Sequence, residues 1–519
     1  MVEVIRLTTI TNMDHLPKSS VRVQETEFLH PNRDNSPLPS FEIEKGTWKL
    51  CVVGLSITIL LSIGCIGFAT NTFIHEKCFC QDEEPRFYSS TIKEIASLIF
   101  NICVTVCTET LGFIHATSLR WALYHEGRLQ FNSNLRLFTN AKKCAANSWY
   151  INYIWAFLIT VSYSSASQVL LPMGGSHLGY RGNYPGAYAL SAQALAILGI
   201  ALLLQSMLAL WCMTPVKSRQ ILSWNSSPLN TTLALLHEGQ IQRTPRAPLI
   251  PQERQSPASK ATKIVKIITL FLWALLPVLL AWGLAMWFVE LRMNHGESND
   301  SFDPQNTSGG VSPGQFGYKG GDWGPKTIMP LMIVTLIQLV YTLALHMAEQ
   351  IVNLTRDEAM WRRAGNISQG ARGAQISPTS VRAVLMSWQS LALLALKPLS
   401  HWFFGLSAVG FSFGYIAFNP VPIFCLAGLS LILAVMVTFL AFRKPEGPQP
   451  AAWGNVQKLA DYIDDWGDGA GGRLYWGDKG QANDTTHRLA GTSPLRCNIG
   501  EIEMNGVLYE DQGGNVSSE

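Results

Sequence analysis

Six apolar stretches of roughly 20 residues or more limit what this chain can fold into. They lie at 50–70, 95–116, 149–171, 187–213, 267–289 and 327–348. A bilayer core about 30 Å thick is crossed by about 20 residues of α-helix, and a helix satisfies its own backbone hydrogen bonds in lipid. The stretches therefore predict an all-α integral membrane protein, with the lipid bilayer as its first partner.

A seventh apolar region, from 384 to 442, is interrupted twice. The first interruption is Lys397-Pro398, and the second is Asn419-Pro420-Val421-Pro422. The pattern predicts spans at 399–418 and 422–442, which brings the bundle to eight helices. The piece before them, 384–396, is interpreted as a surface or re-entrant helix, with a further span as the alternative. Charged residues make up only 14% of the chain against about 25% in soluble proteins, which agrees with this count.

The predicted connecting loops alternate along the chain between loops rich in Lys and Arg and loops with few of them. The connections 119–148 and 214–266 are basic, whereas 72–93 and 290–326 carry an excess of acidic residues. Lys and Arg favour the cytosolic side of a membrane. This alternation of loop charge predicts a plasma-membrane or endomembrane protein with both termini in the cytosol. Residues 1–48 are expected to form a disordered cytosolic tail.

The C-terminal region 443–519 differs from the apolar body. It has twelve acidic and seven basic residues, a net charge of −5, in a chain whose total is +3. Apolar residues recur at helical spacing at Trp453, Val456, Leu459, Ala460 and Ile463. Asn505-Gly506 between apolar residues predicts a hairpin. We expect a small cytosolic appendage that docks on the basic loops, and a protein partner there is the alternative use of this tail.

Polar side chains on one face of the second span are the strongest functional signal. Asn101, Thr105 and Glu109 are spaced by four residues, and His115 lies nearer the end of the same span. Ionisable groups in lipid are costly and mark proton or ion pathways. The alternative is structural, with Glu109 protonated or paired and holding helices together through hydrogen bonds.

Two later spans add further candidates for coupling to protons or cations. The sixth contains Gln338, His346 and Glu349, and the seventh begins near Lys397 and His401. Histidine changes charge near neutral pH, which suits a proton relay. His346 and Glu349 could equally lie at the membrane interface, where charges cost little.

The loops offer few other sites. Cys78 and Cys80 are a candidate disulfide, and Asn299 and Asn306 are candidate glycosylation sites in a loop expected outside the cytosol. No metal-ligand spacing, cofactor fingerprint, nucleic-acid-binding pattern or hydrolase motif occurs, which favours a protein that is not an enzyme. The favoured function is a carrier or channel for a small solute or ion. A receptor or scaffold is the second hypothesis, and a membrane-embedded enzyme is the third.

The stretch SLRWALYHEGRLQFN at 118–132 resembles a group of uncharacterised fungal multi-pass membrane proteins. Similar stretches occur at 349–361 (EQIVNLTRDEAMW) and within 447–478. The resemblance covers most of the chain beyond the first tail. It implies a fungal integral membrane protein and brings no activity, cofactor or site.

Overall fold

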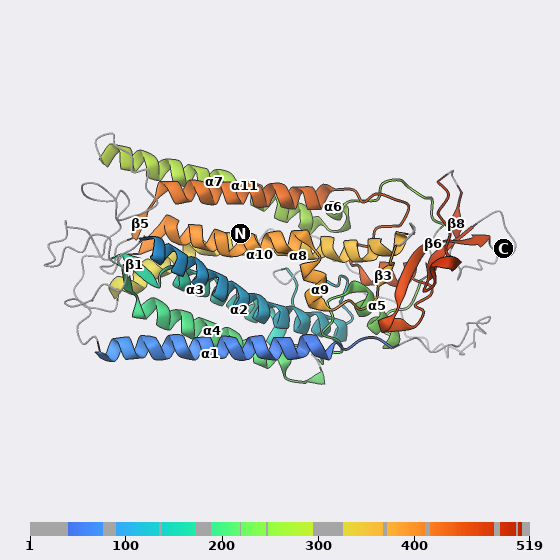
Figure 1. Cartoon of the computed structure of the whole chain (residues 1–519), viewed down its shortest axis with the longest axis horizontal. Helices are drawn as coiled ribbons and strands as arrows, with labels where there is room; N and C mark the ends of the chain where they lie inside the picture. Colours follow the sequence, from blue (N-terminus) through green and yellow to red (C-terminus); the bar gives the residue numbers. More distant parts are fainter. Residues whose placement is uncertain are drawn as a thin grey trace, which may run out of the picture. The chain divides into compact units, whose positions relative to one another are not determined.

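Helices make up most of the part of the chain that can be described. The computed structural model describes residues 40–75, 90–133, 138–172, 188–217, 220–244, 248–293, 325–366, 371–410, 416–481, 488–504 and 507–510. Eight of its longer helices form a bundle (Figure 1). They are α1 (Lys45–His75), α2 (Ser90–His125), α3 (Trp149–Ser167), α4 (Ala192–Met213), α7 (Lys263–Met293), α8 (Pro325–Arg362), α10 (Trp388–Ser407) and α11 (Pro420–Phe442).

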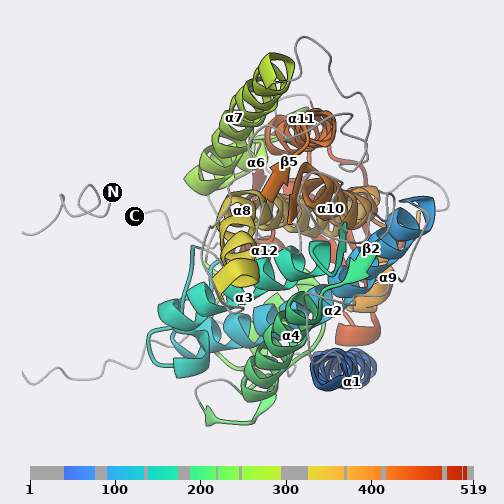
Figure 2. The same cartoon turned by 90° about the vertical axis from the view of Figure 1, so that its left-hand side faces the viewer.

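The bundle has an inner and an outer set of helices. Helices α2, α3, α8 and α10 pack against one another in its middle. Helix α4 packs on α2 and α3, α1 packs on α4, and on the opposite side α11 and α7 follow α10 and α8, as the end-on view in Figure 2 shows. The molecule therefore surrounds four central helices with four that are more apolar on average.

Six of the described helices are long and apolar enough to cross a membrane, namely α1, α2, α4, α7, α8 and α11. The two others, α3 and α10, carry Ser, Tyr, Lys and His side chains and lie in the middle of the bundle. Polar groups are cheaper against protein than against lipid tails. The expectation of an all-α membrane protein is thus met.

The seventh predicted span is displaced in the structure. The expected pieces 384–396 and 399–418 are replaced by a short helix α9 (Ser380–Leu385) and by α10, which runs through Pro398 and ends at Ser407. Proline removes one hydrogen bond from a helix, a local cost that packing against neighbouring helices can offset. The residues beyond Ser407 form a hairpin of β4 (Ala408–Gly410) and β5 (Ile416–Phe418).

Two of the predicted spans are the apolar parts of longer helices. Helix α2 continues nine residues past 116 to His125, and α8 continues fourteen past 348 to Arg362. Both extensions end where the C-terminal region lies, whereas the hairpins β4–β5 and β1–β2 (Leu170–Pro172 and Tyr188–Leu190) lie at the other end of the bundle (Figure 1).

The beginning of the described chain is anchored. Residues 1–39 of the expected tail lie outside the described residues, but 40–48 are ordered and α1 already begins at Lys45. Glu44 accepts hydrogen bonds from the backbone N–H (2.8 Å) and the hydroxyl (2.9 Å) of Ser380, and the carbonyl of Ser40 accepts one from Ala470. Ser40 and the C-terminal region therefore lie at the same end of the bundle.

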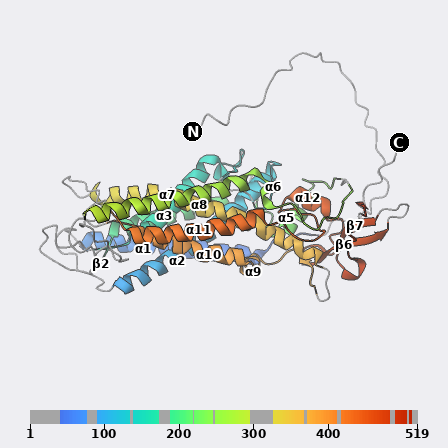
Figure 3. The ribbon, with the colours of Figure 1, turned by 90° about the horizontal axis from the view of Figure 1, so that it is seen from above.

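The C-terminal region folds onto the bundle end with a small sheet. Its strands run in the order β3 (Ala374–Gln375), β6 (Arg473–Gln481), β7 (Arg488–Ser493) and β8 (Tyr509–Glu510). The expected amphipathic helix is α12 (Val456–Tyr462), which is shorter than the predicted apolar stripe. Trp453 and Ile463 flank the helix, and all five residues of the stripe are buried. Helix α12 packs on α5 (Pro228–His237), which belongs to the 214–266 connection, and Figure 3 shows both beside the sheet.

The hairpin predicted around Asn505-Gly506 takes a different form. Those two residues lie outside the described residues, and Tyr509 pairs with Arg488 of β7 and with Leu249 rather than with the segment before the turn. The hairpin that does form joins β6 and β7. Tyr509 is 1% exposed, so burial of one aromatic ring fixes where this last strand pairs.

Asp464 ties α12 to this sheet and makes its stability depend on pH. Its carboxylate accepts hydrogen bonds from Lys479 Nζ at 2.7 Å and from the Thr492 hydroxyl at 3.0 Å. Burial raises the pKa of this carboxyl, but the Lys479 charge and the hydrogen bonds outweigh it, so the pKa is lowered below 3.8. A carboxyl whose pKa is lower in the folded state than in the unfolded state stabilises the fold at pH values above the unfolded-state pKa. This stabilisation is lost as pH falls through the folded-state pKa.

We therefore expect Asp464→Asn to lower the unfolding free energy near neutral pH by about 2 kcal/mol. The difference from wild type should shrink as pH falls below about 4, because Asp464 then binds a proton in the unfolded chain before it does in the folded protein, and it should vanish once pH is below the folded-state pKa. Thermal unfolding of the detergent-solubilised proteins across this range measures it. A difference that stays constant down to about pH 3 would contradict the assignment.

Candidate functional site

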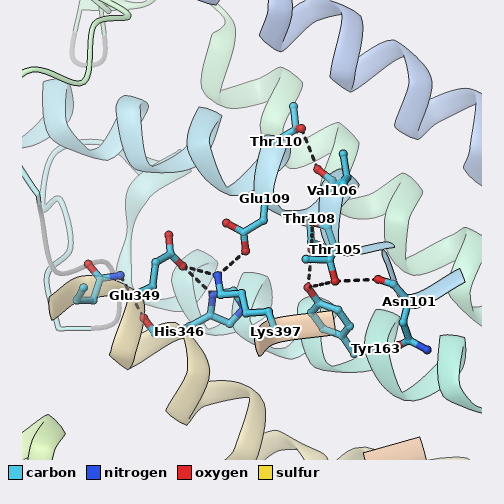
Figure 4. Close-up of polar contacts among 11 residues, drawn as sticks. Asn101, Thr105, Val106, Thr108, Glu109, Thr110, Tyr163, His346, Glu349 and Lys397 are labelled. Atoms are coloured by element: carbon cyan, nitrogen blue, oxygen red, sulfur yellow. Dashed lines mark hydrogen bonds and ion pairs between the residues drawn. The ribbon is translucent and has the colours of Figure 1, made fainter. Parts of the chain in front are cut away.

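A lysine and two glutamates from three central helices meet inside the bundle. Lys397 of α10 is 1% exposed, and its ammonium donates to Glu109 of α2 and, at 2.9 Å, to Glu349 Oε2 of α8. His346 Nδ1 lies 3.2 Å from the same Glu349 oxygen. Figure 4 shows the four side chains converging, and they are called the Lys397 cluster below.

Helix geometry explains why these residues can meet. His346 and Glu349 are three residues apart on α8 and so share a face, and Glu109 lies on the predicted polar face of α2. Helix α10 packs against both α2 and α8, which brings Lys397 between the two carboxylates. The predicted residues Glu109, His346, Glu349 and Lys397 thus form one site, although the sequence offered them as separate faces.

The charges of the Lys397 cluster do not cancel. Two carboxylates and one ammonium give a net charge of −1 when His346 is neutral and the other three groups are ionised. A buried ion pair is retained only when the partners compensate each other's loss of water, and the deficit of one positive charge leaves capacity for another cation. A proton is the smallest cation that could fill it.

The same residues have the geometry of a metal site. One ligand atom each from Glu109, His346 and Glu349 lie within 4.8 Å of one another. The Lys397 ammonium already occupies the place between the two carboxylates, so a metal ion would have to displace it. The arrangement therefore favours protons over a resident metal.

A second polar group lies beside the Lys397 cluster (Figure 4). The ring of Tyr163 stacks on His401 with centroids 3.5 Å apart, and His401 Nδ1 lies 3.0 Å from Gln338 Nε2. The Tyr163 hydroxyl lies 2.9 Å from the Thr108 hydroxyl and donates to Thr105 at 3.4 Å. The predicted residues Thr105, Gln338 and His401 are thus linked through a tyrosine that the sequence did not single out.

The remaining two predicted residues lie farther from the charges. The backbone carbonyl of Asn101 accepts a hydrogen bond from the Thr105 hydroxyl at 2.8 Å, whereas the Asn101 side-chain amide donates to the Ser97 carbonyl at 2.9 Å and does not join the second polar group. His115 stacks on Trp155 at 4.5 Å and lines, together with His346, a cavity of about 30 Å³. A cavity of that size has room for one water molecule between the two histidines.

A larger cavity of about 360 Å³ reaches the Lys397 cluster from the end of the bundle that carries the sheet. Its lining includes Glu109, Glu349 and Lys397, and also Arg120 and Arg356. Arg356 lies seven residues after Glu349, or about 10 Å farther along α8. The cavity therefore connects the charges inside the bundle with arginines at the level of the helix extensions.

Sequence reasoning missed Tyr163, Arg120 and Arg356. Tyr163 lies in the polar run SYSSAS (162–167) of α3, a signal as strong as the face around Glu109. Arg120 contributes only to the basic charge of the 119–148 connection, and Arg356 lies in the 349–361 stretch, because the apolar stretches end before both residues. The candidate disulfide and glycosylation residues, Cys78, Cys80, Asn299 and Asn306, lie outside the described residues.

Comparisons with protein-family models, with curated proteins and with solved structures find no match for the chain. The resemblance to fungal multi-pass membrane proteins stays a prediction. Function is therefore inferred from the geometry of the site itself.

Proposed function

We propose that this protein is a carrier that couples the movement of a solute to protons, with the Lys397 cluster as the coupling site. One observation supports this most: a buried lysine bound to carboxylates from two other helices, with a cavity leading to it. Intramembrane ionisable groups that face a cavity are typical of proton and ion pathways.

The coupling works through competition for the two carboxylates. A proton that enters through the cavity neutralises Glu109 and so removes one of the two negative charges that hold Lys397. The ammonium is then held by Glu349 alone, and the contact between α2 and α10 weakens. A proton can thus shift the balance between two packings of the central helices, which is the physical requirement for alternating access.

In the proposed topology, eight helices cross the membrane. Helices α3 and α10 cross the membrane with the other six, because they share the middle of the bundle with α2 and α8. The end that carries the sheet faces the cytosol, since the basic connections 119–148 and 214–266 belong to it. Both termini are then cytosolic, and the cavity extends from the Lys397 cluster toward that side.

We expect Glu109→Gln to reduce proton uptake by at least about tenfold, because an amide keeps the size of the side chain but does not bind a proton. The measurement uses purified protein in liposomes that contain a pH-sensitive dye and carry an imposed membrane potential. Glu94→Gln is the matched control on the same helix, four turns earlier, where Glu94 accepts from Lys93 and Trp402 outside the cluster.

The proposal is supported if Glu94→Gln takes up protons as fast as wild type and Glu109→Gln takes them up at least about tenfold more slowly. Equal uptake by Glu109→Gln and wild type would reject the coupling role of Glu109. A wild type without uptake at any potential would reject proton coupling as a whole.

A further inference from the structure

Exposed apolar side chains surround the mouth of the 360 Å³ cavity. Leu50 of α1, Val381 and Leu385 of α9, and Leu394 of α10 all line it, and each is between 41% and 58% exposed. Such a rim gives no favourable contact to a polar substrate that enters from water, whereas it lowers the free energy of acyl chains by burying their apolar surface. Since α1 is one of the six helices that are long and apolar enough to cross a membrane, the mouth between α1, α9 and α10 faces lipid in the proposed topology.

Positive charge lies inside the same cavity, behind the apolar rim. Arg120 and Arg356 line it, and neither forms an ion pair with any residue that the structure describes. Arg120 is 6% exposed, and one of its terminal nitrogens donates to the carbonyl of Asn225 at 2.8 Å. The hydrogen bonds that hold the guanidinium in place therefore come from neutral groups.

One acidic group is close to both arginines. Asp357 is buried and within electrostatic range of Arg120 and Arg356, and its carboxylate accepts from Asn132 Nδ2 at 3.0 Å and from Ser133 Oγ at 2.6 Å. At the arginine end of the cavity, two guanidinium groups and one carboxylate leave a local charge of +1, and the Lys397 cluster at the other end carries a net charge of −1. The local excess at the arginine end matches a ligand group with a single negative charge.

Unsatisfied hydrogen-bond donors mark the same place. The Nε–H groups of Arg120 and Arg356 and the hydroxyl of Ser226 are buried and have no hydrogen-bond partner within the described part of the chain. Ser226 is 3% exposed and lines the cavity. A buried donor without a hydrogen-bond partner is costly. Because three such donors lie around one cavity, we expect a ligand there whose oxygens accept their hydrogen bonds.

We infer that the cavity takes the head group of an anionic phospholipid, with the phosphodiester at Arg120 and Arg356 and the acyl chains leaving between α1 and α9. A phosphodiester carries one negative charge and several acceptor oxygens, and guanidinium groups bind it in forked geometry. The rim of leucine and valine side chains then contacts the chains. This inference rests on the proposed carrier function and names its substrate class as an amphiphilic phosphodiester.

The charge match also sets a preference among lipids. A zwitterionic phospholipid brings its own cation beside the two arginines and should bind less tightly than one whose head carries a net charge of −1. An inorganic phosphate ion shares the anionic group but has no chains for the rim. Comparison of these three ligands therefore separates a lipid site from a site for a soluble anion.

The test measures equilibrium binding to the purified full-length protein in detergent. The probes are a short-chain phosphatidylglycerol, the matching phosphatidylcholine, and inorganic phosphate, each titrated calorimetrically. We expect phosphatidylglycerol to bind at least about tenfold more tightly than the other two. Phosphate that binds as tightly as phosphatidylglycerol would overturn the lipid assignment, and so would equal binding of the two lipids.

Two variants test the two halves of the site. Arg356→Gln should weaken phosphatidylglycerol binding by about tenfold, while Arg443→Gln, an exposed arginine after α11 outside the cavity, should leave it unchanged. Leu385→Lys at the rim should weaken lipid binding without affecting the fold, because Leu385 is 58% exposed. Wild-type affinity in both Arg356→Gln and Leu385→Lys would overturn the inference.

The binding test is independent of proton coupling. Titrations are made at equilibrium without a gradient, so a protein that binds lipid but takes up no protons keeps this inference and loses the proposed coupling. A protein that takes up protons but binds none of the three probes keeps the coupling and loses this substrate class.

Discussion

Lys397→Met is expected to destabilise the helix bundle by about 3 kcal/mol and to abolish proton uptake. Methionine has nearly the volume of lysine but leaves Glu109 and Glu349 inside the bundle without their shared cation. Removing one partner of a buried ion pair leaves the other charge uncompensated, which costs more than the pair itself contributes. Thermal unfolding of the detergent-solubilised variant measures the loss.

Rescue by neutralisation distinguishes the electrostatic cause from simple packing damage. The triple variant Lys397→Met, Glu109→Gln, Glu349→Gln removes all three charges and should recover most of the stability, because a neutral, hydrogen-bonded core replaces two unpaired anions. Proton uptake should stay lost. Lys444→Met, an exposed lysine beyond α11, is the matched control. A triple variant as unstable as the single one would show that the charges are not the cause.

Glu358→Ala is expected to release the C-terminal region from the end of α8, at a cost of about 3 kcal/mol. Glu358 is 3% exposed and accepts hydrogen bonds from the backbone N–H groups of Ala452 (3.0 Å) and Trp453 (2.6 Å) and from Arg362 Nε (2.9 Å). Trp453 has a φ of +51°, a conformation that few non-glycine residues adopt. The carboxylate thus holds a strained turn in place.

Limited proteolysis tests the effect of Glu358→Ala directly. Cleavage within 443–519 should become at least about tenfold faster than in wild type, since loss of 1.4 kcal/mol raises an opened population tenfold. Glu446→Ala is the matched control, because its side chain is exposed and only its backbone carbonyl accepts from Arg362. Unchanged cleavage in Glu358→Ala would mean that other contacts hold the region.

The apolar stretches located most of the long helices correctly. Length and hydropathy suffice for helices such as α1, α7 and α11, which keep apolar residues on nearly every side because much of their surface faces outward. They do not suffice for α10, where Lys397, Pro398 and His401 resemble a break between two elements. The polar side chains are buried among other helices, so the helix continues where the local pattern predicts an end.

The polar face of α2 is a similar case for the site. Spacing by four residues correctly grouped Asn101, Thr105 and Glu109 on one side of a helix, because the periodicity of a helix is a local property. The residue that forms an ion pair with Glu109 cannot be found from the local sequence. Lys397 is 288 residues away and was interpreted as the boundary of a span. Tyr163 likewise acquires its role only by stacking on His401 from another helix.

Residues within one or two helical turns of one another suffice to predict that the long helices suit a membrane and which way their polar faces point. The tertiary structure alone decided that an ammonium lies between two carboxylates, that arginines at the ends of apolar stretches line a cavity, and that the stripe of α12 packs on α5. The physical reason is the same in each case: charge pairing and burial depend on which helix faces lie opposite one another, and that is a property of the whole bundle.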